Sequence, residues 1–234
     1  MKLRALDLFC GAGGATRGLQ QAGFHVTGAD LKASPRYIGD RFYQEDALDN
    51  RFNLKLFDFI WASPPCQAHT AMKTMHNAKP HLDLIPATRA MLKASGVPYV
   101  IENVVGAPLE NPVQLCGTMF GLGVGDAELR RHRRFETSFP VIAPKCNHGG
   151  GDVLGVYGGH VRNRKRTIGV YGEGCRDSRR KMDKGHPDFT IEDGRVAMGI
   201  DWMTTAELSQ AIPPAYSKYL AEQWLATRDV RMAA

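Results

Sequence analysis

The clearest indication of the fold lies near the N-terminus, in the run Leu6-Asp7-Leu8-Phe9-Cys10-Gly11-Ala12-Gly13-Gly14. Residues 3–9 predict a short buried strand, the glycines predict a turn, and residues 16–22 predict a helix that Gly23 ends. Glycines between a strand and a helix let the backbone approach a ligand closely, and the free amides at a helix start favour a negatively charged group. The run therefore predicts a strand–turn–helix unit with a ligand beside its turn.

The alternation of strand and helix continues along the chain. Further strands are expected at 24–29, 41–44, 57–62 and 98–104. A helix is expected over 86–94, because proline stands in its first turn and Gly96 follows its end. This order predicts an α/β fold with a doubly wound, mostly parallel sheet. Ligands of such sheets bind beyond the carboxyl ends of the strands.

Two of these strand ends carry reactive side chains. The apolar run at 57–63 passes into Pro64-Pro65-Cys66-Gln67, and the run at 98–101 ends in Glu102-Asn103-Val104. A thiol nucleophile and a carboxylate acid are therefore expected at the same edge of the sheet as the glycine turn.

The composition is that of a globular protein with one full core. The 234 residues are 43% hydrophobic and 23% charged, and the net charge is +6. Five scattered cysteines favour a reducing compartment, and no apolar run is long enough to span a membrane. We therefore expect a cytoplasmic protein without a membrane partner. Its charge permits a polyanionic partner.

The texture of the chain changes after Pro140, where glycines and basic residues gather. The window 160–184 holds nine basic and three acidic residues, which suits either a solvated loop or phosphate contacts. Gly155-Val156-Tyr157-Gly158 recurs as Gly169-Val170-Tyr171-Gly172, which we interpret as two strands of a β-hairpin.

A helical pattern resumes with a capping box at Thr204–Glu207. After Pro213-Pro214 a last helix is expected, with an apolar face made by Tyr216, Tyr219, Leu220 and Trp224. The sequence thus predicts a catalytic and cofactor-binding lobe at 1–139, a small basic insert at 140–195, and a segment at 196–234 that returns to the first lobe.

Four motifs, in this order, resemble those of the DNA (cytosine-5)-methyltransferases: Phe9-Cys10-Gly11-Ala12-Gly13-Gly14, Pro64-Pro65-Cys66-Gln67, Glu102-Asn103-Val104 and Arg131-His132-Arg133. The resemblance spans residues 4–135 and returns at 196–224. It implies the fold of S-adenosylmethionine-dependent methyltransferases, with the insert as a target-recognition region. The implied activity is methylation of cytosine at carbon 5 in DNA.

The resemblance also implies S-adenosylmethionine as the methyl donor. Asp30 ends the second strand, where it can accept hydrogen bonds from ribose hydroxyls, and Asp46 can accept one from an adenine amino group. A turn or a helix cap would also use aspartates there. A dinucleotide is a rival ligand, but Phe9-Cys10 stands where its fingerprint begins with glycine. The cofactor residues expected are Asp7, Phe9, Gly11, Gly13, Gly14, Asp30, Asp46 and Pro64.

The chemistry explains the catalytic residue types. Carbon 5 of cytosine becomes nucleophilic when a thiolate adds to carbon 6, and Cys66 is the candidate nucleophile. Glu102 would protonate or hold ring nitrogen 3, which requires a pKa raised by burial. Arg133 would donate to the 2-oxo group, and Arg131 would support Glu102 or the pocket. A solvated charge run is the alternative for these arginines.

A base stacked in a duplex cannot reach Cys66, so the cytosine must be rotated out of the helix. The polar segment after Cys66 is expected to close over it. The nucleic-acid contacts expected are Gln67, Thr70, Lys73, Arg162, Arg164 and Arg166.

Several positions depart from the family pattern. Leu129 stands where glutamine is usual before the arginines, Gln210 stands where asparagine is usual before the prolines, and the insert is short. Cys146-Asn147-His148, with His160 and Cys175 downstream, raises a zinc hypothesis, but this spacing matches no common zinc finger and we expect no metal. Cys10 and Cys116 are expected to be small buried residues near the cofactor turn.

The leading hypothesis is a compact monomeric DNA (cytosine-5)-methyltransferase of a phage or bacterial restriction-modification system, acting in the cytoplasm of a bacterial or phage-infected cell. The same chemistry on RNA is an alternative, since a single-stranded loop presents its base without flipping. A nucleic-acid-binding protein that keeps the fold without turnover is a third.

Overall fold

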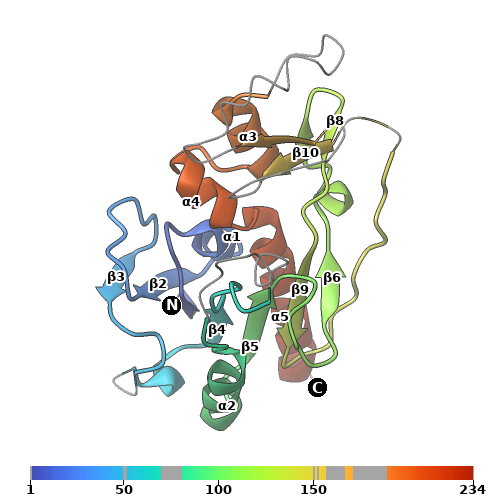
Figure 1. Cartoon of the computed structure of the whole chain (residues 1–234). Helices are drawn as coiled ribbons and strands as arrows, with labels where there is room; N and C mark the ends of the chain where they lie inside the picture. The colour runs from blue at the N-terminus through green and yellow to red at the C-terminus, as the bar shows by residue number, and fades with distance from the viewer. Residues whose placement is uncertain are drawn as a thin grey trace.

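A mostly parallel seven-stranded sheet forms the centre of the computed structural model, which describes residues 2–49, 52–69, 81–149, 151, 153–156, 167–170 and 189–233 (Figure 1). The first five strands in the sheet order are parallel, and β9 is antiparallel to both of its neighbours. The order is β3 (Arg41–Gln44), β2 (His25–Asp30), β1 (Arg4–Leu8), β4 (Phe59–Ala62), β5 (Tyr99–Asn103), β9 (Arg133–Thr137) and β6 (Val113–Leu115). The predicted α/β fold is confirmed.

Helices cover both faces of this sheet. Helices α1 (Gly14–Gln21) and α5 (Pro214–Ala233) lie on one face, and α2 (Ile85–Ser95) lies on the other (Figure 1). Strand β4 shows the alternation that this requires: Phe59 and Trp61 pack in the core with α1 and α5, whereas Ile60 and Ala62 pack in the core beneath α2. The short 3₁₀ helix η1 (Leu54–Leu56) precedes β4.

A second, smaller sheet stands beside the first (Figure 1). Its order is β11 (Thr167–Val170), β10 (Val153–Val156), β8 (Ala127–Leu129) and β7 (Gly123–Val124). Helices α3 (Ile191–Met198) and α4 (Thr205–Gln210) share its apolar core, and the 3₁₀ helix η3 (Gly117–Phe120) leads into it. Strands β7 and β8 lie before residue 140, so this sheet begins earlier in the chain than the expected insert.

The hairpin predicted from the repeated Gly-Val-Tyr-Gly sequences is wrong. Strands β10 and β11 pair in parallel, with Gly155 opposite Gly169. Two similar strand sequences predict two strands but leave their relative direction open. Ten residues separate these strands in the sequence, which exceeds the two to five residues of usual hairpin loops.

The other predicted elements appear within two residues of their expected ends. Helix α2 has proline in its first turn and ends at Gly96 with φ 69°, and α4 begins with the capping box of Thr204 and Glu207. Helix α3 was missed, although Thr190 and Asp193 form a capping box at its start. Among the described residues, no helix is both long and apolar enough to cross a membrane.

The C-terminal helix closes against the first helix. The Ser217 hydroxyl donates a hydrogen bond to the Ala15 carbonyl at 2.8 Å. A Cβ atom at Gly18 would lie 2.1 Å from both the Pro214 carbonyl oxygen and the Ser217 Oγ. Helices α1 and α5 can therefore pack this closely only because residue 18 is glycine.

A Gly18→Ala substitution should lower stability by about 1–3 kcal/mol, because the collision outweighs the better helix propensity of alanine. Thermal and urea unfolding would measure this effect. Gln21→Ala, at an exposed position of the same helix, is the matched control and should be neutral or slightly stabilising. A Gly18→Ala protein as stable as the control would show that the contact is not restrictive.

Strand β1 carries a carboxyl group into the core. Asp7 is fully buried, the Thr16 hydroxyl donates to its Oδ2 at 2.6 Å, and its Oδ1 has no hydrogen-bond partner. Burial raises the pKa of Asp7 to about 7. The native state therefore keeps a proton that the unfolded chain releases near pH 4.

Stability should consequently fall as the pH rises from about 4 to about 7, and this contribution should level off above that range. An Asp7→Asn protein, which can still accept the Thr16 hydroxyl, should show a flatter dependence of Tm on pH. Asp201→Asn, at an exposed site, should keep the wild-type slope. Parallel curves for wild type and Asp7→Asn would contradict the raised pKa.

Candidate active site

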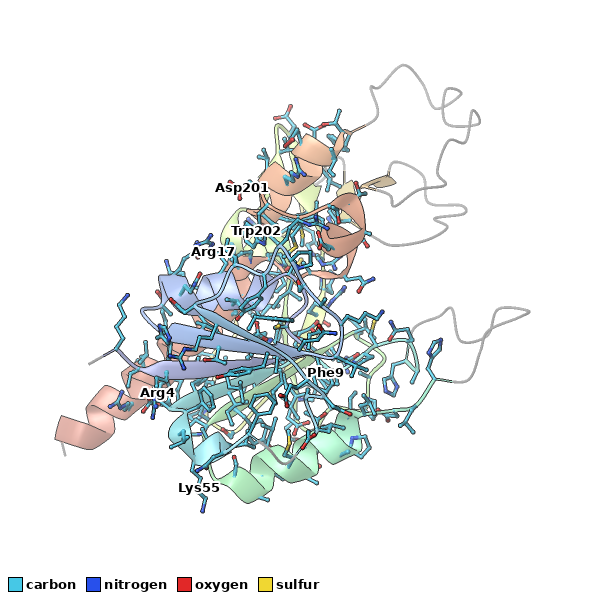
Figure 2. The ribbon with its side chains drawn as sticks, turned by 90° about the vertical axis from the view of Figure 1, so that its left-hand side faces the viewer. Arg4, Phe9, Arg17, Lys55, Asp201 and Trp202 are labelled. Carbon is cyan, nitrogen blue, oxygen red and sulfur yellow. The ribbon has the colours of Figure 1, made fainter. Side chains whose placement is uncertain are left out.

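The glycine turn lies at the carboxyl ends of β1 and β2. Figure 2 shows Arg4 at the opposite end of β1 from Phe9, which lies where the turn begins. The backbone bends sharply here, with φ of 59° at Phe9, 50° at Gly11 and 90° at Gly13. A left-handed phenylalanine is uncommon and costs energy, and such strain gathers at functional sites.

Asp30 ties the turn to the end of β2. The Gly11 amide donates to Asp30 Oδ2 at 2.9 Å, and the Lys32 amide donates to Oδ1 at 3.0 Å. The predicted position at the strand end is thus observed, together with a turn contact. Asp46 lies two residues after β3, and its Oδ1 accepts from the Leu48 amide at 2.9 Å. Both carboxylates organise the backbone at the edge where a ligand would bind.

The C-terminal segment supports the turn from another side. The Trp202 indole donates to the Ala12 carbonyl at 2.8 Å, and the Arg17 guanidinium lies 5.2 Å from the Trp202 ring centre (Figure 2). A Cβ atom at Gly14 would lie 2.8 Å from the Ile212 carbonyl oxygen. Packing against the C-terminal segment therefore requires a glycine at position 14.

Cys66 lies in a turn that follows β4. The side-chain amide of Asn103, on β5, donates to the Pro64 carbonyl at 2.8 Å. The His69 amide donates to the Cys66 carbonyl at 2.9 Å, and His69 Nε2 lies 2.9 Å from Asp83 Oδ1. These contacts fix the backbone on both sides of the partly buried thiol. Through its hydrogen bond with Asn103, Pro64 helps to hold the backbone around Cys66.

Glu102 is the buried carboxyl group of the site. It is only 7% exposed on β5, and Arg133 Nε lies 3.1 Å from its Oε1. Burial raises the pKa of Glu102, while Arg133 and Arg131 oppose this shift. Burial also raises the pKa of the Cys66 thiol, and the nearby Glu102 carboxylate adds to this. The two groups therefore interact electrostatically, and burial shifts the pKa of each upward.

Arg131 points at backbone carbonyls. It is 2% exposed, and its guanidinium donates to the carbonyls of Val156, Ser209 at 2.8 Å and Ala211 at 2.6 Å. The Tyr216 hydroxyl donates to the Arg131 carbonyl at 2.7 Å. Arg131 thus joins β10 and the C-terminal segment to the chain just before β9. Its positive charge also lowers the pKa of Glu102 and of Cys66, against the effect of burial.

Sequence reasoning assigned no role to three residues of the site. Asn103 holds the Pro64 carbonyl, Trp202 holds the turn at Ala12, and Tyr37 packs over the middle of β2. The sequence does hold a signal for the Tyr37 contact, because a glycine within a strand, here Gly28, indicates close packing. In the structure, a Cβ atom at Gly28 would lie 2.4 Å from the Tyr37 ring. Asn103 stands next to Glu102 in the sequence, but only the folded structure shows that its partner is the Pro64 carbonyl.

The predicted nucleic-acid contacts lie largely beyond the part of the chain that the structure describes. Gln67 is described, and it lies exposed in the turn after Cys66. Thr70, Lys73, Arg162, Arg164 and Arg166 lie outside the described residues, as do His160 and Cys175. Gln210 is exposed at the end of α4.

Comparison with known proteins supports this description. Residues 3–107 match the family model of the C-5 cytosine-specific DNA methylases. No match was found among curated proteins.

Solved structures with the same fold cover nearly the whole chain. A candidate DNA modification methyltransferase encoded within an E. coli prophage is 14% identical, with a TM-score of 0.58 over 96% of this chain and 99% of that chain. The S. pombe Dnmt2 methyltransferase is 13% identical, with a TM-score of 0.59 over 97% and 99% of the two chains. A Spodoptera frugiperda DNMT2 mutant is 13% identical, with a TM-score of 0.55 over 94% and 98%.

At these identities the solved structures establish the fold alone, while the match to the family model covers residues 3–107. That matched region contains the glycine turn, Cys66 and Glu102, which occupy the carboxyl ends of β1, β4 and β5. Residues 3–107 therefore match the C-5 cytosine-specific DNA methylase family, which supports a DNA cytosine methyltransferase.

Proposed function

We propose that this protein transfers a methyl group from S-adenosylmethionine to carbon 5 of a cytosine in DNA, through a covalent bond between Cys66 and a flipped-out base. The main support is the electrostatic coupling of Cys66, Glu102 and Arg133 at the ends of β4, β5 and β9. A thiol, a buried acid and a cation together match the needs of addition to a pyrimidine ring.

The residues around the glycine turn suit S-adenosylmethionine. A Cβ atom at Gly11 would meet nothing within 4 Å, so the left-handed turn presents open backbone beside the Asp30 carboxylate. The start of α1 favours the carboxylate of the methionyl group, and Asp30 can accept from ribose hydroxyls. When bound there, the cofactor supplies an electrophilic methyl group. We assign Asp7, Phe9, Gly11, Gly13, Gly14, Asp30, Asp46 and Pro64 to this side of the site.

Cys66 begins the reaction by adding its sulfur to carbon 6 of the cytosine. Its raised pKa keeps the thiol protonated at neutral pH, so the thiol proton must pass to solvent water as the carbon–sulfur bond forms. The electron pair of the 5,6 double bond then makes carbon 5 nucleophilic. After methylation, a base removes the proton from carbon 5, and the carbon–sulfur bond breaks to release Cys66.

Glu102 and Arg133 stabilise the charge that this addition creates. A protonated Glu102 can donate to ring nitrogen 3, which then carries less negative charge as the sulfur adds. Arg133 holds Glu102 through Nε and donates to the His132 carbonyl through Nη1 at 2.9 Å. Its remaining N–H groups can donate to the 2-oxo oxygen. Arg131 positions Arg133 by tying the preceding backbone to the C-terminal segment.

DNA is the proposed substrate, with Gln67, Thr70, Lys73, Arg162, Arg164 and Arg166 as its proposed contacts. The family and the net charge of +6 support this choice. We propose a monomeric enzyme, with every proposed catalytic group on the same chain. We place its activity in the cytoplasm of a bacterial or phage-infected cell.

Methyl transfer from labelled S-adenosylmethionine should place the label in 5-methyldeoxycytidine when unmethylated genomic DNA is offered. A Cys66→Ala protein should lose this activity by at least ~10³-fold, because the step that activates carbon 5 is removed. Nucleoside analysis of the digested product would measure it, and calorimetry should show that the variant still binds S-adenosylmethionine.

Bulk tRNA offered in parallel tests the RNA alternative. Label found only in tRNA would move the same chemistry to RNA. Label in DNA that persists in Cys66→Ala would rule out the covalent mechanism. No label in either nucleic acid, with S-adenosylmethionine bound, would favour a binding protein without turnover.

A Glu102→Gln protein should lose about 10²–10⁴-fold in kcat, because glutamine fills the site but has no carboxyl proton to give. In the wild type, the activity that depends on protonated Glu102 should fall as the pH rises through its raised pKa. The pH profile of single-turnover rates would show this fall in activity at higher pH, and the Glu102→Gln protein should lack it. Glu110→Gln, at an exposed glutamate, should keep the wild-type rate and profile.

A further inference from the structure

Four metal-binding side chains gather outside the proposed reaction centre. Cys116, His132, Cys146 and His148 each offer one ligand atom, and these four atoms lie within 4.8 Å of one another. Cys116 Sγ lies 3.3 Å from His148 Nε2, and Cys146 Sγ lies 3.5 Å from His132 Nε2. The cluster corrects the expectation that Cys116 lies near the cofactor turn.

These separations suit one tetrahedral ion. With bonds of ~2.3 Å to sulfur and ~2.0 Å to nitrogen, the ligand atoms of a tetrahedral zinc site stand about 3.3–3.8 Å apart. The two measured sulfur–nitrogen pairs fall in this range. The rings of His132 and His148 stand nearly edge to face at 75°, with both Nε2 atoms beside a sulfur. Only a small shortening of the distances between the four ligand atoms would place all of them around one ion.

We propose that Cys116, His132, Cys146 and His148 bind a structural zinc ion. Two thiolates and two imidazoles are the ligand set that prefers zinc among the common divalent ions, and four protein ligands leave no open position for chemistry. Binding would release the two thiol protons to solvent as the two sulfur–zinc bonds form. The sequence analysis expected no metal, whereas the four side chains that the structure brings together support this proposal.

The ligands come from three separate parts of the chain. Cys116 directly follows β6, His132 lies between β8 and β9, and Cys146 and His148 belong to the segment that leads from β9 to β10. This segment crosses from the first sheet to the second, and it is also held where Arg130 Nη2 donates to the Gly149 carbonyl at 2.5 Å. The ion would fasten that crossing to the edge strand of the first sheet.

The site also has a link to catalysis through His132. Its neighbours in sequence are Arg131, which holds the C-terminal segment, and Arg133, which holds Glu102. An ion bound to His132 would restrict the backbone between these two arginines. The four ligands are therefore proposed as positioning residues and not as catalytic ones.

Metal analysis of protein purified without chelators or a histidine tag would test the site. We expect about one zinc ion per chain, and Cys146→Ser and His148→Asn proteins should each lose most of it. Cys10→Ser and His25→Asn are the matched controls and should retain it. The Cys66→Ala protein should also keep its zinc while losing methyl transfer, so the metal readout is independent of the proposed reaction.

Replacing zinc with cobalt(II) gives a second readout in the wild-type chain, should a variant fail to fold. A tetrahedral site with thiolate ligands shows intense visible bands and a sulfur-to-cobalt charge-transfer band. Removing the metal should lower Tm and kcat, and adding zinc should restore both. Wild-type protein that takes up neither zinc nor cobalt in this way would overturn the proposal. So would a Cys116–Cys146 disulfide mapped by mass spectrometry after anaerobic purification.

Discussion

The arrangement of the two sheets depends on one buried cation. The Arg131 guanidinium is withdrawn from water, so its charge must be matched by hydrogen-bond acceptors, and three backbone carbonyls provide them. Those carbonyls belong to β10, to the end of α4 and to the residue after it. Because all of them must converge on one side chain, the second sheet and the C-terminal segment cannot move independently of the strand that carries Arg133.

The same arrangement sets the electrostatic state of the reaction centre. Burial favours a neutral thiol at Cys66 and a neutral carboxyl at Glu102, while the arginines favour the ionised carboxylate. Two negative charges in this buried volume would repel each other, so a thiolate at Cys66 is easier to form when Glu102 keeps its proton. The chemistry proposed for cytosine needs this combination, in which the nucleophile loses a proton while the acid holds one.

Much of the fold followed from local patterns. The strands at residues 4–8, 25–30, 59–62 and 99–103 have apolar runs bounded by glycine, proline or charged residues, and their order predicts parallel pairing. The strands of two or three residues, β6, β7 and β8, are too short for any periodicity to show. The direction of β11 relative to β10 depends on chain connection rather than composition. The positions of Cys66 and Glu102 at strand ends could be predicted from the sequence, but the contacts of Asn103 and of the group around Cys116 join residues 14 to 39 positions apart.

The contact between α1 and α5 has a consequence for how the chain reaches this structure. Ala15 and Ser217, joined by a hydrogen bond, are 202 positions apart in the sequence. During synthesis, the first helix leaves the ribosome long before its partner exists, and the apolar face containing Leu19 remains uncovered meanwhile. Pairing of such distant segments is slow because a large loop must be closed. Completion of the N-terminal β–α unit, and with it the proposed cofactor turn, therefore awaits translation of α5, about 200 residues later.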